Sequence, residues 1–414
     1  MLLDPKMATS RLNREGHNYK PVLNSPSRDK NGKQMKKHHK IISAGAGGIA
    51  EAGALLLAEW SGVTPSIYIG NRTLSKAEEL VKWVKEGTTK NCAIEAFHLP
   101  GDKVTEEMKS IFEQADIILD CLPGSLAPGI ATLAKDFKLH YVNLTEYVAE
   151  TEEIMKLARD ADSGFVLQSG LAPGYINILA MGLYRDFCKD FGVEKVDKLE
   201  FKVGALTKNA VSPHYYGFTW SPVGVATEYL NKAFVLRDYQ KTSLPPLSER
   251  NRIIIDGITY EDDLTSGGAA DLPDALAGKV RNLDYKTLRH PGHYAWVEEQ
   301  LKNTGKGPEA VKKLQEIMQA AIPNIEDDQI ILYAAVEGKD SSGTLQRREI
   351  SKRILPLEVG KHTLRAIQTT TAAGLLQCAQ IILESNKKGV VLQSMIDPEK
   401  FLNGDFITRV YGKI

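Results

Sequence analysis

The chain has 414 residues, of which 43% are hydrophobic and 25% charged, and its formal net charge at pH 7 is zero. This composition suits a globular protein of two domains, and balanced charge gives no support to a nucleic-acid or bulk membrane partner. No apolar run approaches the roughly 20 residues that span a bilayer. The four cysteines are widely spaced without a C-x-x-C pair, which argues against disulfides and a zinc site, and we therefore expect reduced thiols in a cytoplasmic protein.

The first forty residues differ in composition from the rest of the chain. They hold ten Lys or Arg against three Asp or Glu, with few large apolar residues. Such a segment cannot bury enough surface to fold alone, so we predict a disordered basic tail over residues 1–39. Met35 lies just before the first predicted strand, which makes it a plausible alternative start.

Predicted strands and helices alternate from residue 40 to 170, the pattern of a parallel sheet with helices on both faces. The expected fold of this part is a Rossmann dinucleotide-binding domain. Its predicted strands are 41–44, 66–70, 93–97, 117–120, 141–144 and 165–167, and its predicted helices are 48–59, 75–85, 106–112, 130–137 and 152–160.

The first strand runs directly into a loop of small residues that is typical of dinucleotide binding. Gly45 permits the tight turn, Gly47 lets the backbone approach a pyrophosphate, and Ala50 keeps the next helix close to the sheet. The N–H groups at the start of that helix favour bound phosphate. The predicted cofactor-binding residues of this loop are Gly45, Ala46, Gly47, Gly48 and Ile49.

The end of the second strand distinguishes NAD from NADP. An acid there binds the ribose 2′-hydroxyl, whereas a neutral residue followed by Arg accommodates a 2′-phosphate. This chain has Asn71, Arg72 and Thr73 at that place, and the guanidinium can bind phosphate through two hydrogen bonds. We predict NADP as the cofactor, with NAD as the alternative and Arg72 as a solvated surface residue in that case.

Ligands of open α/β sheets bind at the carboxyl ends of the strands, so we expect three further turns to line the nicotinamide pocket. The residues expected there are Cys121, Leu122 and Pro123, then Leu144, Thr145 and Glu146, then Gly170, Leu171, Ala172 and Pro173. A buried structural thiol is the alternative interpretation of Cys121.

Beyond residue 170 the pattern changes to longer strands and mixed helices, which predicts a mixed-sheet α+β substrate-binding domain over residues 171–362. Its predicted strands are 199–203, 253–255, 330–336 and 348–355, and its predicted helices are 225–230, 296–302 and 308–321. The aromatic segment 206–222, which contains Tyr216, is a candidate substrate loop. A helix over 369–384, within the segment 363–414, is expected to pack back on the first domain.

Several motifs together resemble the saccharopine dehydrogenase family, in its saccharopine reductase and lysine 6-dehydrogenase branches. They are Gly45–Gly48, Gly170–Gly174 with Asn177, Phe218–Pro222, Thr265–Gly268 and Leu283–His293, and their order covers nearly everything beyond the tail. The resemblance implies hydride transfer at the ε C–N bond of lysine or a lysine adduct with a nicotinamide cofactor. It also implies a homodimer or higher homo-oligomer formed through the second domain.

The motifs divide between the two branches. Saccharopine reductases commonly have a substrate-contacting acid at the position of Ala172, so Ala172 and Asn177 resemble the lysine 6-dehydrogenases. The run Asn71–Thr73 instead resembles the NADP-dependent reductases. A carboxynorspermidine-type reductase and a non-catalytic NADP-binding regulator remain alternatives.

Candidate substrate and catalytic residues follow from the chemistry of an amino-acid substrate. Arg289 is the candidate for the α-carboxylate because Arg pairs with carboxylates through two hydrogen bonds. Asp271 is a candidate for an ammonium group, and Tyr216 and Asn177 are candidate substrate contacts. For the proton that moves as an amine becomes an imine we predict His293 first and Lys286 second. Structural roles for these side chains are the alternatives.

Overall fold

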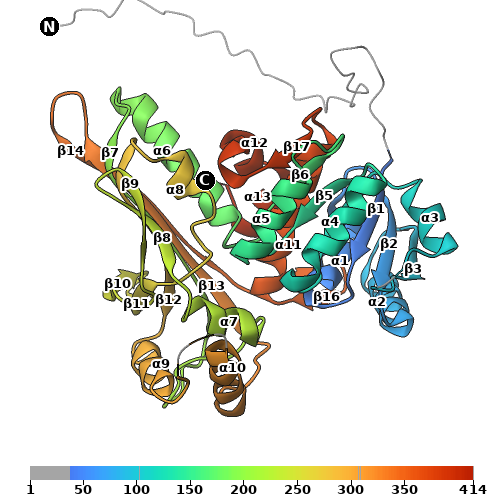
Figure 1. Ribbon diagram of the computed structural model, residues 1–414, viewed down its shortest axis with the longest axis horizontal. Helices are drawn as coiled ribbons and strands as arrows, with labels where there is room; N and C mark the ends of the chain where they lie inside the picture. Colours follow the sequence, from blue (N-terminus) through green and yellow to red (C-terminus); the bar gives the residue numbers. More distant parts are fainter. Residues whose placement is uncertain (1–37, 102, 306, 308, 414) are drawn as a thin grey trace, which may run out of the picture. The chain divides into compact units, whose positions relative to one another are not determined.

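The computed structural model describes residues 38–413 except 102, 306 and 308. The predicted tail, apart from His38 and His39, and the alternative start at Met35 lie outside the described residues. Within the described part, one sheet belongs to the first domain and a second, larger sheet to the second domain (Figure 1).

The first sheet has seven parallel strands in the order β17-β6-β5-β4-β1-β2-β3. The strands are β1 (Lys40–Ala44), β2 (Ser66–Asn71), β3 (Ile94–His98), β4 (Ile117–Asp120), β5 (His140–Asn143), β6 (Gly164–Val166) and β17 (Gly389–Val391). Strand order reverses beside β1, between β2 and β4, and this is where dinucleotides bind in such folds. The prediction of a Rossmann domain is confirmed.

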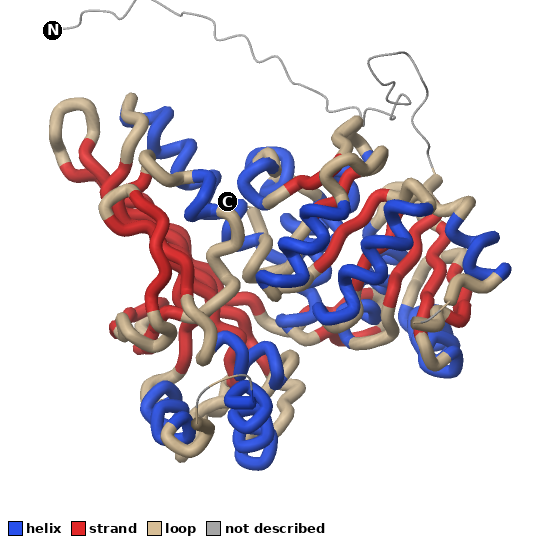
Figure 2. The backbone as a smooth tube through the Cα atoms, in the orientation of Figure 1, coloured by secondary structure: helices blue, strands red, loops and turns tan. Residues whose placement is uncertain are grey.

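Helices cover both faces of this sheet (Figure 2). One face packs against α1 (Gly48–Trp60), α2 (Leu74–Gly87) and α11 (Ala366–Leu383). The other face packs against α3 (Glu106–Phe112), α4 (Ala127–Asp136) and α5 (Val148–Leu157). A short 3-10 helix, Gly124–Leu126, precedes α4.

The second sheet is mixed, with the strand order β10-β11-β12-β7-β13-β14; in addition β8 pairs with β12, and β9 pairs with β8. The strands are β7 (Val196–Thr207), β8 (Ala233–Arg237), β9 (Gln240–Leu244), β10 (Asn251–Ile255), β11 (Ile258–Leu264), β12 (Val280–Arg289), β13 (Asp328–Lys339) and β14 (Leu345–Ile354). Strands β7 and β12 are parallel, whereas β7 and β13 are antiparallel. The mixed-sheet prediction is therefore confirmed.

Five helices accompany the second sheet: α6 (Tyr175–Phe191), α7 (Pro222–Glu228), α8 (Leu272–Ala275), α9 (His293–Leu301) and α10 (Glu309–Ala321). Helix α6 and strand β12 lie where no element was expected. The first ten residues of α6 are all buried, so it shows no clear amphipathic period. Strand β12 carries Asp284, Lys286 and Arg289, which break the apolar pattern of a core strand.

The last part of the chain returns to the first domain. The hairpin β15 (Leu357–Val359) and β16 (His362–Leu364) leads into α11, and β17 then pairs with β6 at the edge of the Rossmann sheet. A 3-10 turn (Gln393–Met395), α12 (Pro398–Leu402) and α13 (Asp405–Tyr411) follow. Helix α11 is long and apolar enough to cross a membrane, but 78% of it is buried inside the protein. A buried share this large is typical of a helix in the core of a globular protein.

Candidate active site

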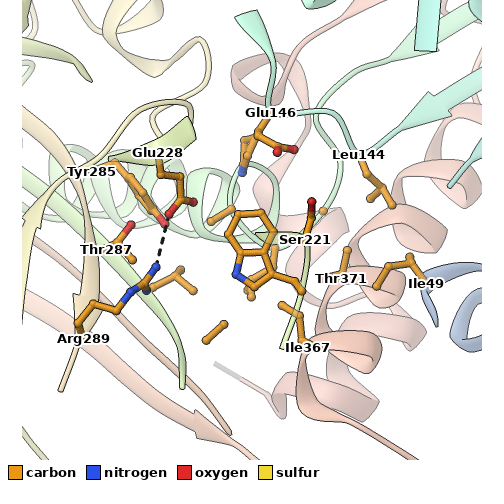
Figure 3. A pocket seen from close by; sticks show the side chains of 17 residues that line it. Ile49, Leu144, Glu146, Ser221, Glu228, Tyr285, Thr287, Arg289, Ile367 and Thr371 are labelled. Carbon is orange, nitrogen blue, oxygen red and sulfur yellow. Dashed lines mark ion pairs between the residues drawn. The ribbon is translucent and has the colours of Figure 1, made fainter. Parts of the chain in front are cut away.

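A cavity of about 230 Å³ lies where the carboxyl edge of the Rossmann sheet meets β7, β12, α7 and α11. Figure 3 shows Leu144 and Ile49 on one side of it and Arg289, Glu228 and Tyr285 on the other. Seventeen residues line it: Ile49, Leu144, Glu146, Gly170, Leu171, Ala172, Pro173, Val203, Ala205, Trp220, Ser221, Glu228, Tyr285, Thr287, Arg289, Ile367 and Thr371. The cavity therefore joins the predicted cofactor edge to the second domain.

The loop between β1 and α1 has the geometry that a pyrophosphate needs. Gly45 has a φ of +112°, and an added Cβ would lie 3.1 Å from the carbonyl oxygen of Cys121. Nothing lies within 4 Å of a Cβ added to Gly47, which is the N-cap residue of α1 and leaves that helix without a side-chain cap. The open space and the free N–H groups fit a dinucleotide phosphate. Ala46 and Gly48 complete the loop, and Ile49 lines the cavity.

Two side chains from the start of α11 lie against this loop, and neither was predicted. A Cβ added to Gly48 would lie 3.1 Å from Gln368 Nε2 and 3.4 Å from Arg365 Nη2. Gln368 donates to the carbonyl oxygen of Gly48 over 2.9 Å and to Glu51 over 3.3 Å. The buried environment raises the pKa of Glu51, and the nearby Arg365 guanidinium opposes this rise. Arg365 thus supplies positive charge beside the phosphate loop.

Replacing Arg365 by Gln should weaken NADPH and NADH equally, because both dinucleotides contain the pyrophosphate. We expect the Kd of each to rise about tenfold, the effect of losing one partly exposed charge-assisted hydrogen bond. Titration of cofactor fluorescence measures both constants. The substitution Lys361→Gln, at an exposed residue of the β15–β16 turn, makes the same charge change as a control. An effect on one cofactor alone would contradict a pyrophosphate contact.

The residues predicted to distinguish NADP from NAD, Asn71, Arg72 and Thr73, follow one another at the end of β2. The Asn71 side chain donates to the carbonyl oxygen of Thr73 over 3.0 Å and so stabilises the turn into α2. Arg72 and Thr73 are exposed. An exposed guanidinium beside the strand that adjoins the glycine loop is free to bind a ribose 2′-phosphate.

The three turns expected at the nicotinamide pocket differ in their positions. Leu144 and Glu146 line the cavity, as do Gly170, Leu171, Ala172 and Pro173. Cys121, Leu122, Pro123 and Thr145 are not among the lining residues. Burial raises the pKa of the Cys121 thiol to about 12, and its carbonyl group packs under Gly45. These features favour the structural interpretation of Cys121.

Arg289, at the end of β12, is 1% exposed and lines the cavity. Its Nε donates to the Tyr229 hydroxyl over 2.7 Å, and its Nη1 donates to the Leu288 carbonyl oxygen over 3.0 Å. Its guanidinium lies 4.9 Å from the ring centre of Tyr216. The remaining nitrogen, Nη2, has no hydrogen-bond partner. A buried cation with a free donor beside a cavity is suited to bind a carboxylate.

Glu228, at the end of α7, forms the ion pair drawn in Figure 3, with its Oε2 3.5 Å from Arg289 Nη2. This oxygen also has no hydrogen-bond partner. Burial raises the pKa of Glu228 to about 8, although Arg289 opposes the rise. Both partners of this buried ion pair therefore keep unused hydrogen-bonding capacity toward the cavity.

His293 lies behind Arg289 and does not line the cavity. Its Nδ1 is 2.6 Å from the carbonyl oxygen of His214, so this nitrogen carries the proton and donates it. Its Nε2 is 3.0 Å from the Tyr229 hydroxyl and accepts from it, since that hydroxyl already accepts from Arg289. Burial, with the Arg289 charge, lowers the pKa of His293 to about 3. We therefore revise its predicted proton-transfer role: His293 is neutral and positions Tyr229 and Arg289.

Acid should destabilise the protein through His293. Because the folded-state pKa is below the ordinary value, the unfolded chain binds more protons between pH 6.5 and 3, and stability falls as pH falls. This residue should cost about 2 kcal/mol of unfolding free energy between pH 8 and pH 5. Urea unfolding at both pH values should show a smaller fall for His293→Asn than for the wild type. His38→Asn, at an exposed residue, is the control; equal falls would refute the assignment.

Three other predicted substrate or catalytic residues do not line the cavity, and neither does Tyr216, whose ring packs against the Arg289 guanidinium. Lys286 faces the opposite side of β12 from Arg289, where it donates to the carbonyl oxygen of Glu249 and lies 3.4 Å from Asp262. Asp271 accepts from the Ser394 hydroxyl over 2.5 Å. Asn177 accepts from Gly174 N over 2.8 Å and donates to Gly268 O over 2.9 Å. These contacts indicate structural roles for Lys286, Asp271 and Asn177.

Among the described residues, no group of three His, Cys, Asp or Glu side chains is placed to hold a metal ion. The chemistry of the cavity comes from Arg289, Glu228 and Glu146. Burial raises the pKa of Glu146 as well as that of Glu228. Glu228 was not predicted as a site residue because it appeared as one acid within a short predicted helix.

Two family models match the chain. Residues 41–167 match the saccharopine dehydrogenase NADP binding domain, and residues 170–404 match the saccharopine dehydrogenase C-terminal domain. Mitochondrial alpha-aminoadipic semialdehyde synthase of Rattus norvegicus is 25% identical over 203 residues, and that of Mus musculus is 27% identical over 135 residues. The matches cover 49% and 32% of this chain but only 21% and 14% of those proteins.

Solved structures share the fold. The apo saccharopine dehydrogenase (L-Glu forming) of Saccharomyces cerevisiae is similar, with a TM-score of 0.68 and 15% identity over 90% of this chain and 96% of that chain. The homospermidine synthase of Legionella pneumophila, in complex with NAD, gives a TM-score of 0.61 and 13% identity over 91% and 90%. The two family models together cover nearly all of the described residues, and the chain therefore belongs to the saccharopine dehydrogenase family of oxidoreductases, which confirms the resemblance of its motifs.

Proposed function

We propose that the protein is an NADP-dependent oxidoreductase that transfers hydride at the ε C–N bond of lysine or of a lysine adduct such as saccharopine. The observation that carries this proposal is Arg289, a buried cation whose Nη2 has no hydrogen-bond partner, in the cavity that Ile49 and the turn Gly170–Pro173 also line. A substrate carboxylate on Arg289 would hold the rest of the molecule beside the carboxyl edge of the Rossmann sheet.

The residues that would hold the dinucleotide are those of the glycine loop, with Arg365 near the pyrophosphate and Arg72 near the ribose. When bound, it supplies the two-electron hydride acceptor or donor. Apolar lining from Leu144, Leu171 and Ile367 would exclude water from the reacting carbon. The neutral Asn71 in place of a ribose-binding acid, followed by Arg72, supports NADP over NAD.

Nicotinamide absorbance at 340 nm tests the proposal. The purified protein is assayed for cofactor reduction with lysine or saccharopine, and for cofactor oxidation with aminoadipate semialdehyde plus glutamate, each with both cofactors. We expect turnover with at least one of these amines or imines and a higher kcat/KM with the NADP form. Tight cofactor binding without turnover of any of them would reject the oxidoreductase proposal.

A further inference from the structure

The charges that line the cavity restrict the class of substrate. Among the lining residues, three carry ionisable charge: Glu146, Glu228 and Arg289. Ammonium groups of a bound ligand favour the ionised form of both carboxylates, and the cavity then has one positive and two negative groups. An ion inside a low-dielectric cavity needs an opposite partner. The cavity thus complements a ligand with one carboxylate and two ammonium groups, and it offers a single cation to a tricarboxylate adduct such as saccharopine.

The Arg289–Glu228 pair matches the two charged groups on the α-carbon of an amino acid. Nη2 of Arg289 and Oε2 of Glu228 are 3.5 Å apart, and neither has a hydrogen-bond partner. Contacts to Tyr229 and Leu288 hold the guanidinium in place. One free donor and one free acceptor at this separation can bind an α-carboxylate and an α-ammonium side by side.

Glu146 supplies a second carboxylate to the cavity, at a distance from Glu228 along α7. Its Oε1 would lie 3.0 Å from a Cβ added to Gly224, at the beginning of α7. Glu228 is four residues further along α7, a rise of about 6 Å. Glu146 follows β5, so it lies at the sheet edge expected beside the nicotinamide. A chain of four carbons, as in lysine, can span this separation.

We propose that Arg289 and Glu228 bind the α-carboxylate and α-ammonium of a diamino monocarboxylic acid, and that Glu146 accepts the proton of its reacting side-chain ammonium. The inference rests on the proposed function and assigns its substrate class. In the proton step the N–H bond of the ammonium breaks and an O–H bond forms on Glu146, leaving a neutral amine and a carboxylic acid. The neutral amine has the lone pair that must assist loss of hydride from the adjacent carbon.

A substrate series combined with Glu228→Gln tests the head-group contact. Wild-type enzyme is assayed with lysine, with 6-aminohexanoate, which lacks the α-amine, and with saccharopine. We expect lysine to exceed 6-aminohexanoate by about 10- to 100-fold in kcat/KM, the effect of one charge-assisted hydrogen bond. In Glu228→Gln this ratio should fall to near one, and in the wild type lysine should exceed saccharopine.

Glu146→Gln tests the proton acceptor. Its kcat should fall by about 10²- to 10⁴-fold with lysine and with 6-aminohexanoate alike, because both carry the reacting ammonium. Glu153→Gln, at an exposed residue of α5, makes the same charge change and should leave kcat unchanged. Cofactor affinity and thermal unfolding are measured for each variant to establish folding. If Glu146→Gln unfolds, Glu146→Asp, which moves the carboxylate by one methylene, should lower kcat without altering the substrate ratio.

The results separate the two proposals. Preference for saccharopine over lysine, or an unchanged lysine to 6-aminohexanoate ratio in Glu228→Gln, overturns the inference while the oxidoreductase proposal stands. A normal kcat in Glu146→Gln also overturns it. Failure of every amine and imine with both cofactors instead rejects the proposed function itself.

Discussion

Replacing Arg289 by Gln should reduce kcat/KM for the amino-acid substrate by about 30- to 5,000-fold, because truncating one partner of a buried charge pair between enzyme and substrate costs about 2–5 kcal/mol of binding free energy. The substitution deletes the buried Nη2 donor, and it removes the positive charge that opposes the rise in the pKa of Glu228. Steady-state kinetics at saturating cofactor measure the effect. Cofactor affinity should stay unchanged, since the glycine loop and Arg365 lie outside this contact.

Arg289→Lys serves as the matched control because it keeps the charge. A lysine cannot donate to Tyr229 and Leu288 and at the same time present a planar pair of donors to a carboxylate, so most of the loss should persist. Full activity in either Arg289 variant would refute carboxylate binding at this residue.

The Rossmann domain could be predicted because its strands and helices have simple periods. Short sequence patterns also predict the β1–α1 glycine loop, whose small residues leave room for a pyrophosphate, and the end of β2, where a neutral residue and Arg follow the strand. Both segments lie as expected beside the reversal of strand order. The second sheet was predicted less completely. Strand β12 is polar because one face supplies Thr287 and Arg289 to the cavity and the other forms the buried ion pair of Lys286 with Asp262.

The site residues that were missed lie far apart in the sequence. Glu228 reaches the cavity only because α7 brings it to Arg289, 61 positions away along the chain. Arg365 approaches the glycine loop only because the chain returns to the first domain after β16. His293 illustrates the opposite error, since its residue type suggested proton transfer. The sequence alone did not reveal its complete burial or its two hydrogen bonds.

Arg72 should control the choice between the two nicotinamide cofactors. In Arg72→Ala we expect the Kd for NADPH to rise about 10- to 150-fold, the loss of charge-assisted hydrogen bonds worth about 1.5–3 kcal/mol. The Kd for NADH should change little, because that cofactor has no 2′-phosphate for the guanidinium to bind. Fluorescence titration with both reduced cofactors gives the two constants on the same protein sample.

The selectivity of this change distinguishes Arg72 from Arg365. Arg365→Gln should weaken both cofactors, so the ratio of their Kd values separates a ribose phosphate contact from a pyrophosphate contact. Arg159→Ala, at an exposed residue just after α5, removes one positive charge elsewhere and should leave both constants unchanged. If Arg72→Ala weakens NADH as much as NADPH, Arg72 does not contact the 2′-phosphate. The neutral Asn71 would then be compatible with a protein that uses NAD.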